Sequence, residues 1–116
     1  MKILDAEIEF DFNDADDMER FEKQLDVMAP KLQAIKAVGR KRSVVIREFC
    51  EAVLDCLDNT FGEGTSKKVF GERTNLTLCI KAFEDLCIAR DDYDKEFEKQ
   101  IKELESKYSP NLADRG

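Results

Sequence analysis

The sequence predicts a mainly α-helical protein: a small domain of three to four helices, with a short N-terminal β-strand or extended arm and a long C-terminal helix. Its 116 residues suffice for one domain with one modest core. Charged residues make up 39% of the chain, against a usual quarter, and only two residues are proline. Apolar residues recur at spacings of three and four, as in amphipathic helices. We expect residues 1–109 to form the domain and residues 110–116 to form a flexible tail.

Residues 3–12 are expected to form the strand or arm. Apolar side chains alternate there with acidic ones, which is the period of a half-buried strand. The apolar positions are Ala6, Ile8, Phe10 and Phe12. Because one strand is not stable alone, it must pair with a second strand, of this chain or of another copy, or lie against the helices.

The first helix is predicted over residues 14–38. Asn13 or Asp14 suits the N-cap position, and acidic residues follow in the first turn, where the helix dipole favours them. Pro30 removes one backbone hydrogen bond at a cost of about 3 kcal/mol, so we expect a kink or a break near Ala29. Gly39 and the basic residues after it indicate the end of this helix. Its apolar seam comprises Met18, Phe21, Leu25, Met28, Leu32 and Ile35.

The second helix is predicted over residues 43–61, with Ser43 as its cap and Gly62 as its stop. A short helical turn over residues 65–70 follows and ends at Gly71. The phenylalanines that precede the two glycines are expected to anchor this joint in the core. The apolar face of the second helix comprises Ile46, Phe49, Val53, Leu57 and Phe61.

The third helix is predicted over residues 75–108, capped by Thr74 or Asn75. Its sequence turns strongly polar at "ARDDYDK", residues 89–95. We therefore expect its far half to leave the core and either project or pack on another chain. Pro110 ends the helix, because the residue before a proline is pushed out of helical geometry.

Composition argues against several function classes. A net charge of -7 disfavours direct binding to nucleic acid, which needs cations against phosphates. The absence of histidine removes the commonest general base and metal ligand, so we expect no enzyme, no catalytic residues, no cofactor and no metal. Neither a signal peptide nor an apolar membrane span is recognisable, which indicates a cytoplasmic protein without membrane contact. In that compartment the four cysteines, Cys50, Cys56, Cys79 and Cys87, are expected to be buried thiols.

Three motifs could carry chemistry, and each has a structural explanation that we favour. The segment "GEGTSKK" shares residues with a phosphate-binding loop but lacks its order and the preceding strand. Residues 11–17 contain the acids of a calcium loop without its glycine, and a capped helix start explains them. A carboxylate stripe on the second helix could form a di-metal or acid–base site, or simply a solvated or partner-facing surface. The stripe comprises Glu48, Glu51, Asp55 and Asp58.

We expect a protein-binding surface on the two long apolar seams and on the one basic cluster. The cluster lies at a helix end and could bind an acidic partner or the carboxylates of another copy. A favourable interaction with the helix dipole also explains it. The candidate partner-binding residues are Met18, Phe21, Leu25, Met28, Arg40, Lys41, Arg42, Phe97, Ile101 and Leu104.

The segments "FDFNDADDMERFE", "REFCEAV", "FGEGTSKKVFGERTNL" and "KYSPN" resemble a family of short proteins from phages and prophages of Gram-positive, Clostridium-like bacteria. Members of that family look like tail-module proteins encoded near the tail tube and the tape-measure protein, and are similar to tail assembly chaperones. The resemblance implies a factor in the bacterial host's cytoplasm that binds helical segments of a tape-measure or other tail protein. It also suggests a homo-oligomer.

Two other functions remain open. A small acidic phage-encoded inhibitor could bind a host nuclease or defence protein by imitating the phosphates of DNA, which suits the net charge of -7. A metal enzyme based on the carboxylate stripe is the third and least favoured hypothesis.

Overall fold

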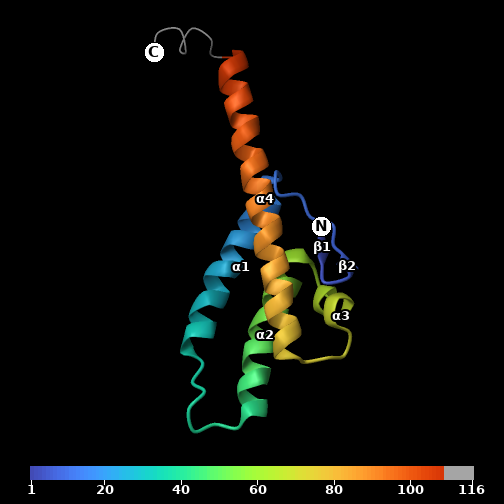
Figure 1. Cartoon of the computed structure of the whole chain (residues 1–116), viewed down its shortest axis with the longest axis vertical. Coiled ribbons are helices and arrows are strands. Elements are labelled where there is room, and N and C mark those ends of the chain that lie inside the picture. Colours follow the sequence, from blue (N-terminus) through green and yellow to red (C-terminus); the bar gives the residue numbers. More distant parts are fainter. Residues whose placement is uncertain (109–116) are drawn as a thin grey trace.

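A computed structural model describes residues 1–108 and confirms the mainly helical fold, with a short N-terminal sheet and a long C-terminal helix (Figure 1). The expected tail at 110–116 lies outside the described residues. The elements are β1 (Lys2–Ile3), β2 (Ala6–Glu7), α1 (Ala15–Ala34), α2 (Arg42–Phe61), α3 (Thr65–Phe70) and α4 (Leu76–Tyr108).

The N-terminal segment, expected as a strand or arm over residues 3–12, forms a short hairpin followed by an extended arm, so the strands cover less of it than expected. β1 pairs antiparallel with β2, with Ile3 opposite Ala6. Leu4, in the turn, has a φ of 52°, a left-handed conformation that costs a residue other than glycine about 1–2 kcal/mol. Its amide donates to Oδ2 of Asp85 on α4 at 2.9 Å, and this bond holds the turn in place. The strand therefore finds its partner within its own chain.

Helix α1 begins where the acidic residues indicate. Asp14 is the N-cap, and its carboxylate accepts the amide of Asp17 at 2.9 Å. The helix continues through Pro30 without a break and ends at Ala34, four residues before the expected end at 38. One missing hydrogen bond near the last turn removes too little stability to divide a helix whose apolar face is packed.

Helix α2 begins at Arg42 with Lys41 as its N-cap, so the expected cap at Ser43 was wrong. No side chain caps this end; an ion pair holds the preceding loop on the helix instead. Arg40 donates from Nη1 to one oxygen of Glu48 at 2.8 Å and from Nη2 to the other at 2.5 Å. This hydrogen-bonded pairing lowers the pKa of the Glu48 carboxyl.

The segment between α2 and α4 connects the two helices, and its hydrogen bonds and glycines have structural roles. Asp58, near the end of α2, accepts the amide of Ser66 at 2.7 Å and its hydroxyl at 2.8 Å, and so caps α3. Gly62 ends α2 with a φ of 116°, which side chains rarely permit. Phe70 is buried and Phe61 is partly buried. A phosphate would have to displace the carboxylate of Asp58 from the start of α3.

The core lies between α2 and its neighbours, and only the first half of α4 takes part in it. Cys79, Ala82 and Leu86 are the buried residues of α4. From Asp91 onward every described residue is exposed, so the far half projects from the body, as its polar composition predicts (Figure 1). The molecule is accordingly elongated, with extents of 64 × 29 × 21 Å.

An aromatic cluster marks the point where α4 leaves the body. The ring of Phe12 stacks on Tyr93 of α4 at 4.5 Å between centroids. Phe10 packs edge-on against Phe12 and against Phe61 of α2, both at 4.8 Å. Phe21 of α1 contacts both arm residues at about 6 Å. The N-terminal arm thus connects three helices through its two phenylalanines.

Burial of the rings predicts which residues of the joint matter for stability. Replacing Phe70 by Ala should lower the free energy of unfolding by about 3–5 kcal/mol, because a buried ring is lost and a cavity remains. Lys67→Ala, which removes only an exposed ion pair with Glu72, should change it by less than about 0.5 kcal/mol. Urea unfolding followed by circular dichroism measures both. Equal losses from the two substitutions would contradict this view of the joint.

The buried thiols predict a loss of stability in alkali. Desolvation, followed by hydrogen bonding and charge interaction with Cys50, raises the pKa of the Cys79 thiol to about 12. Above about pH 9 the unfolded chain loses this proton while the folded chain keeps it, so the thiol's contribution falls between pH 9 and 12. Thermal unfolding across this range should show a shallower decline for Cys79→Ala than for the wild type. Parallel declines would show that other groups dominate.

Candidate protein-binding surface on α4

The seam of α1 is part of the core, so it does not serve as the expected partner surface. Phe21 and Met28 are 1% and 4% exposed. Met18 and Leu25 are partly buried and pack against the same core. Spacing along α1 identified the apolar face correctly, but α2 of the same chain covers it.

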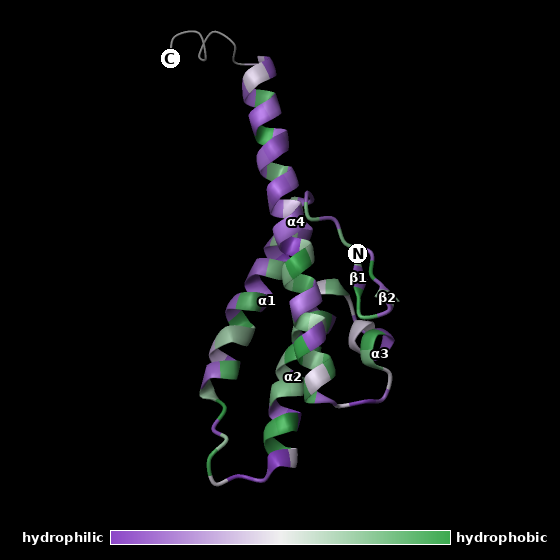
Figure 2. Ribbon diagram, viewed as in Figure 1, coloured by the Kyte–Doolittle hydropathy of each residue, from purple (hydrophilic) through white to green (hydrophobic). Residues whose placement is uncertain are grey.

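The apolar residues on the far half of α4 are open to solvent. Phe97, Ile101 and Leu104 are 52%, 37% and 51% exposed, and Tyr108 is exposed as well. Their spacings of four, three and four place them on one face of the helix. Figure 2 shows that the far half of α4 is largely hydrophilic, with a few hydrophobic positions. The structure thus keeps three of the expected partner-binding residues together and accessible.

A second apolar surface lies beside the first half of α4, and the sequence did not reveal it. It is a groove of about 420 Å³ between α4, α2 and the end of α1. Ile80, half exposed, and Phe83 line it from α4. The other apolar lining residues are Leu32, Phe49, Val53, Leu76 and Cys79. In the sequence, only the spacing of four and three between Leu76, Ile80 and Phe83 indicates such a surface.

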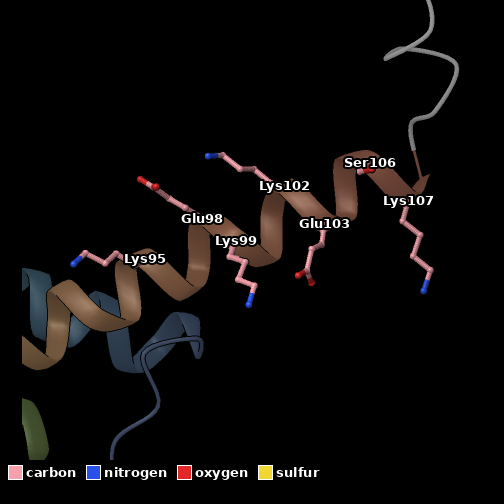
Figure 3. Close-up of a pocket in the computed structure, with 7 residues that line it drawn as sticks. All are labelled: Lys95, Glu98, Lys99, Lys102, Glu103, Ser106 and Lys107. Atoms are coloured by element: carbon pink, nitrogen blue, oxygen red, sulfur yellow. The ribbon is translucent and has the colours of Figure 1, made fainter.

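The charged face of the projecting half is an open helix surface. Side chains from Lys95 to Lys107 extend from the helix in several directions, with no second element facing them (Figure 3). The space between them is bounded by one helix alone, so it does not form an enclosed site. Lysines and glutamates are interleaved along it, and neither sign forms an uninterrupted row.

The basic cluster lies apart from the projecting stripe. Arg40, Lys41 and Arg42 lie at the junction of the α1–α2 loop and α2, at the end of the molecule opposite the far half of α4 (Figure 1). Arg40 forms an ion pair with Glu48 and also donates to the carbonyl of Lys36 at 3.0 Å. Lys41 and Arg42 are exposed. The expected residues therefore form two separate surfaces.

The acidic motifs are engaged in local structure. Glu48 and Asp58, at the two ends of the carboxylate stripe, hold the α1–α2 loop and cap α3. Asp17, in the segment that resembles a calcium loop, accepts from Arg20 at 2.5 Å and from the amide of Asp11 at 3.3 Å. Within residues 1–108, no three His, Cys, Asp or Glu side chains are grouped so as to hold a metal ion. The helices described there include none with the length and apolar character to span a membrane.

Comparison with known proteins places the chain in a family without indicating a function. No curated protein and no solved structure matches it. The profile of one protein family matches residues 4–116, which is nearly the whole chain. The helical body, the joint and the projecting α4 all lie within the match. The chain therefore belongs to the family of unknown function DUF6673.

Proposed function

We propose that the protein is a non-enzymatic binding factor of a phage or prophage, similar to a tail assembly chaperone, which covers helical segments of a tape-measure or other tail protein. The observation that carries the proposal is the apolar stripe of Phe97, Ile101 and Leu104, which no other element within residues 1–108 covers. Exposed apolar faces of this kind mark sites of protein binding. Amphipathic helices bind one another through such residues at spacings of three and four.

The groove beside Ile80 and Phe83 supports the same mode of binding. Its walls come from three helices, and its lining is almost entirely apolar. A partner helix would fill it as a further helix of the bundle, in contact with Phe49 and Leu32. A tape-measure protein is a long helical chain with apolar faces that aggregate until the tail tube encloses them, so it offers ligands of this kind. The cytoplasm of the bacterial host is the compartment in which such a factor would act.

Self-association is part of this proposal. A helix with this much exposed apolar surface is expected to be covered at high concentration, and another copy offers the same surface in complementary form. Homo-oligomers would then protect the stripe before a tail protein binds. We expect no direct contact with nucleic acid or membrane.

The distribution of charge favours this function over the acidic inhibitor. A phosphate mimic needs carboxylates in a row, unbroken by cations. On the projecting half, Lys95, Lys99 and Lys102 interrupt the acidic residues, and Arg40 neutralises Glu48 on α2. An inhibitor of this kind would bind a nuclease in a strongly salt-dependent way.

The function predicts a specific loss of partner binding on substitution in the stripe. Ile101→Asp should abolish copurification with the tape-measure protein encoded in the same phage genome and leave that protein insoluble, because it places a charge in an apolar contact. Ser106→Asp makes the same charge change on the opposite face and should preserve both. Circular dichroism should show both variants folded, since both positions are exposed.

Two results would contradict the chaperone function. One is a tape-measure protein that remains insoluble beside the wild-type chain, with no complex recovered. The other is salt-sensitive binding to a host nuclease that Ile101→Asp leaves unchanged, which would support the inhibitor.

A further inference from the structure

The exposed seam of α4 follows one repeat along the whole helix. Its positions alternate between steps of four and three residues from Leu76 to Tyr108, which is the period of a coiled coil. The groove side of the helix supplies the first part of this seam and the projecting half supplies the last part. In order, the seam positions are Leu76, Ile80, Phe83, Cys87, Arg90, Asp94, Phe97, Ile101, Leu104 and Tyr108.

Two charged residues interrupt the seam at its centre. Arg90 and Asp94 occupy consecutive seam positions, with apolar residues at the seam positions before and after them. Arg90 lies 3.4 Å from Asp91 of its own helix, an exposed contact worth little. Tyr93, between the two, stacks on Phe12 and belongs to the body. Arg90 and Asp94 are therefore the residues that a helix docked on this seam would meet at mid-length.

We propose that a second copy covers this seam, with the two α4 helices packed antiparallel about a two-fold axis near Asp92. This pairing rests on the self-association proposed above and specifies its interface and its register. In this register each seam residue meets the one that lies equally far from Asp92 on the other side. Ile80 thus meets Leu104 of the second copy, Phe83 meets Ile101, and Cys87 meets Phe97. Leu76 meets Tyr108 at the ends.

Charge selects this orientation. In the antiparallel register Arg90 of each copy faces Asp94 of the other. Each of the two central layers then contains one ion pair between the copies. A parallel pairing in register would place Arg90 against Arg90 and Asp94 against Asp94. Like charges in a seam oppose association, and a polar seam residue is a common means of fixing the register of paired helices.

The groove adds contact surface that two isolated helices would lack. Each projecting half would enter the groove of the other copy, where Leu32, Phe49 and Val53 add walls from α1 and α2. By symmetry this contact forms twice. The paired helices extend over 33 residues each, about 50 Å. The interface would cover the half-exposed rings and aliphatic chains of both halves, Ile80 and Phe97 among them.

One feature of the flanking surface opposes the pairing. Glu84 and Glu98 lie beside the seam and would approach each other across the two helices. Lys81 and Lys102 lie one turn from Glu84 and Glu98 on their own helices, a spacing that permits partial neutralisation of each carboxylate. The same geometry brings Asp91 near Asp91 of the second copy, and Arg90 of its own helix lies 3.4 Å from it. The repulsion acts at the solvent-exposed edge, where water and salt screen it.

Charge exchange between two variants tests the central layers. Arg90→Asp places two acids at the centre of each seam, and Asp94→Arg places two cations there. The dimer of each variant alone should therefore have a dissociation constant at least tenfold above that of the wild type. An equimolar mixture should form a one-to-one heterodimer, because each acid then faces a cation of the other chain. Within each variant chain positions 90 and 94 still carry like charges, so recovery can come only from contact between chains. Sedimentation equilibrium over a range of concentrations measures all three samples.

Cross-linking tests the orientation. A mixture of Ile80→Cys and Leu104→Cys chains, oxidised under mild conditions, should give a disulfide between position 80 of one chain and position 104 of the other. Peptide mass spectrometry identifies the linked positions. A parallel pair would instead link like positions, giving 80 to 80 and 104 to 104. That result would overturn the antiparallel register.

The outcomes separate this inference from the proposed function. A wild-type oligomer that neither charge substitution weakens contradicts this interface and leaves self-association standing. A wild-type monomer at every concentration contradicts both. A dimer with the expected cross-links that fails to bind the tape-measure protein contradicts the chaperone function alone.

Discussion

The length of α4 relative to its neighbours is the constraint on which the rest of the structure depends. α4 has 33 residues, whereas α1 and α2 have 20 each, so it is about 50 Å long against about 30 Å. Its first half packs on α2 through small residues, with Ala82 fully buried. Tyr93, which stacks on Phe12, lies where the helix leaves the body. Beyond that point no other element within residues 1–108 covers the helix, and its apolar residues are exposed there.

A projecting helix must also be stable without such cover. Its sequence places acids four residues before lysines in the favourable order, at Asp91 and Lys95, Glu98 and Lys102, and Glu103 and Lys107. Each pair at this spacing stabilises a helix by a few tenths of a kcal/mol. The first half, fixed in the core, supplies the nucleus from which the far half propagates. The binding surface is therefore ordered before a partner arrives, which lowers the entropy lost on binding.

Periodicity and capping residues predicted the helical fold and the projection of the far half of α4. The hairpin was missed because no glycine or asparagine marks its turn. Leu4 adopts the left-handed conformation there, and its amide donates a hydrogen bond to Asp85, which is distant in sequence. The site was predicted in part. A seam of threes and fours looks the same whether it faces the core, as at Phe21, or solvent, as at Ile101. The roles of Glu48 and Asp58 depend on Arg40 and Ser66, whose proximity only the folded chain establishes.

The charged interruption of the α4 seam is the feature that a single chain explains least well. Apolar residues at Arg90 and Asp94 would have extended the seam without a break, and neither charge is needed to end the helix, which continues to Tyr108. Polar residues at seam positions weaken association while restricting it to arrangements that pair them. At these two positions, pairing favours a partner helix that presents an acid to Arg90 and a cation to Asp94. A second copy of α4 does so when it runs antiparallel. The composition of α4 thus suits specific pairing of moderate affinity, which the proposed exchange of a second copy for another protein partner would require.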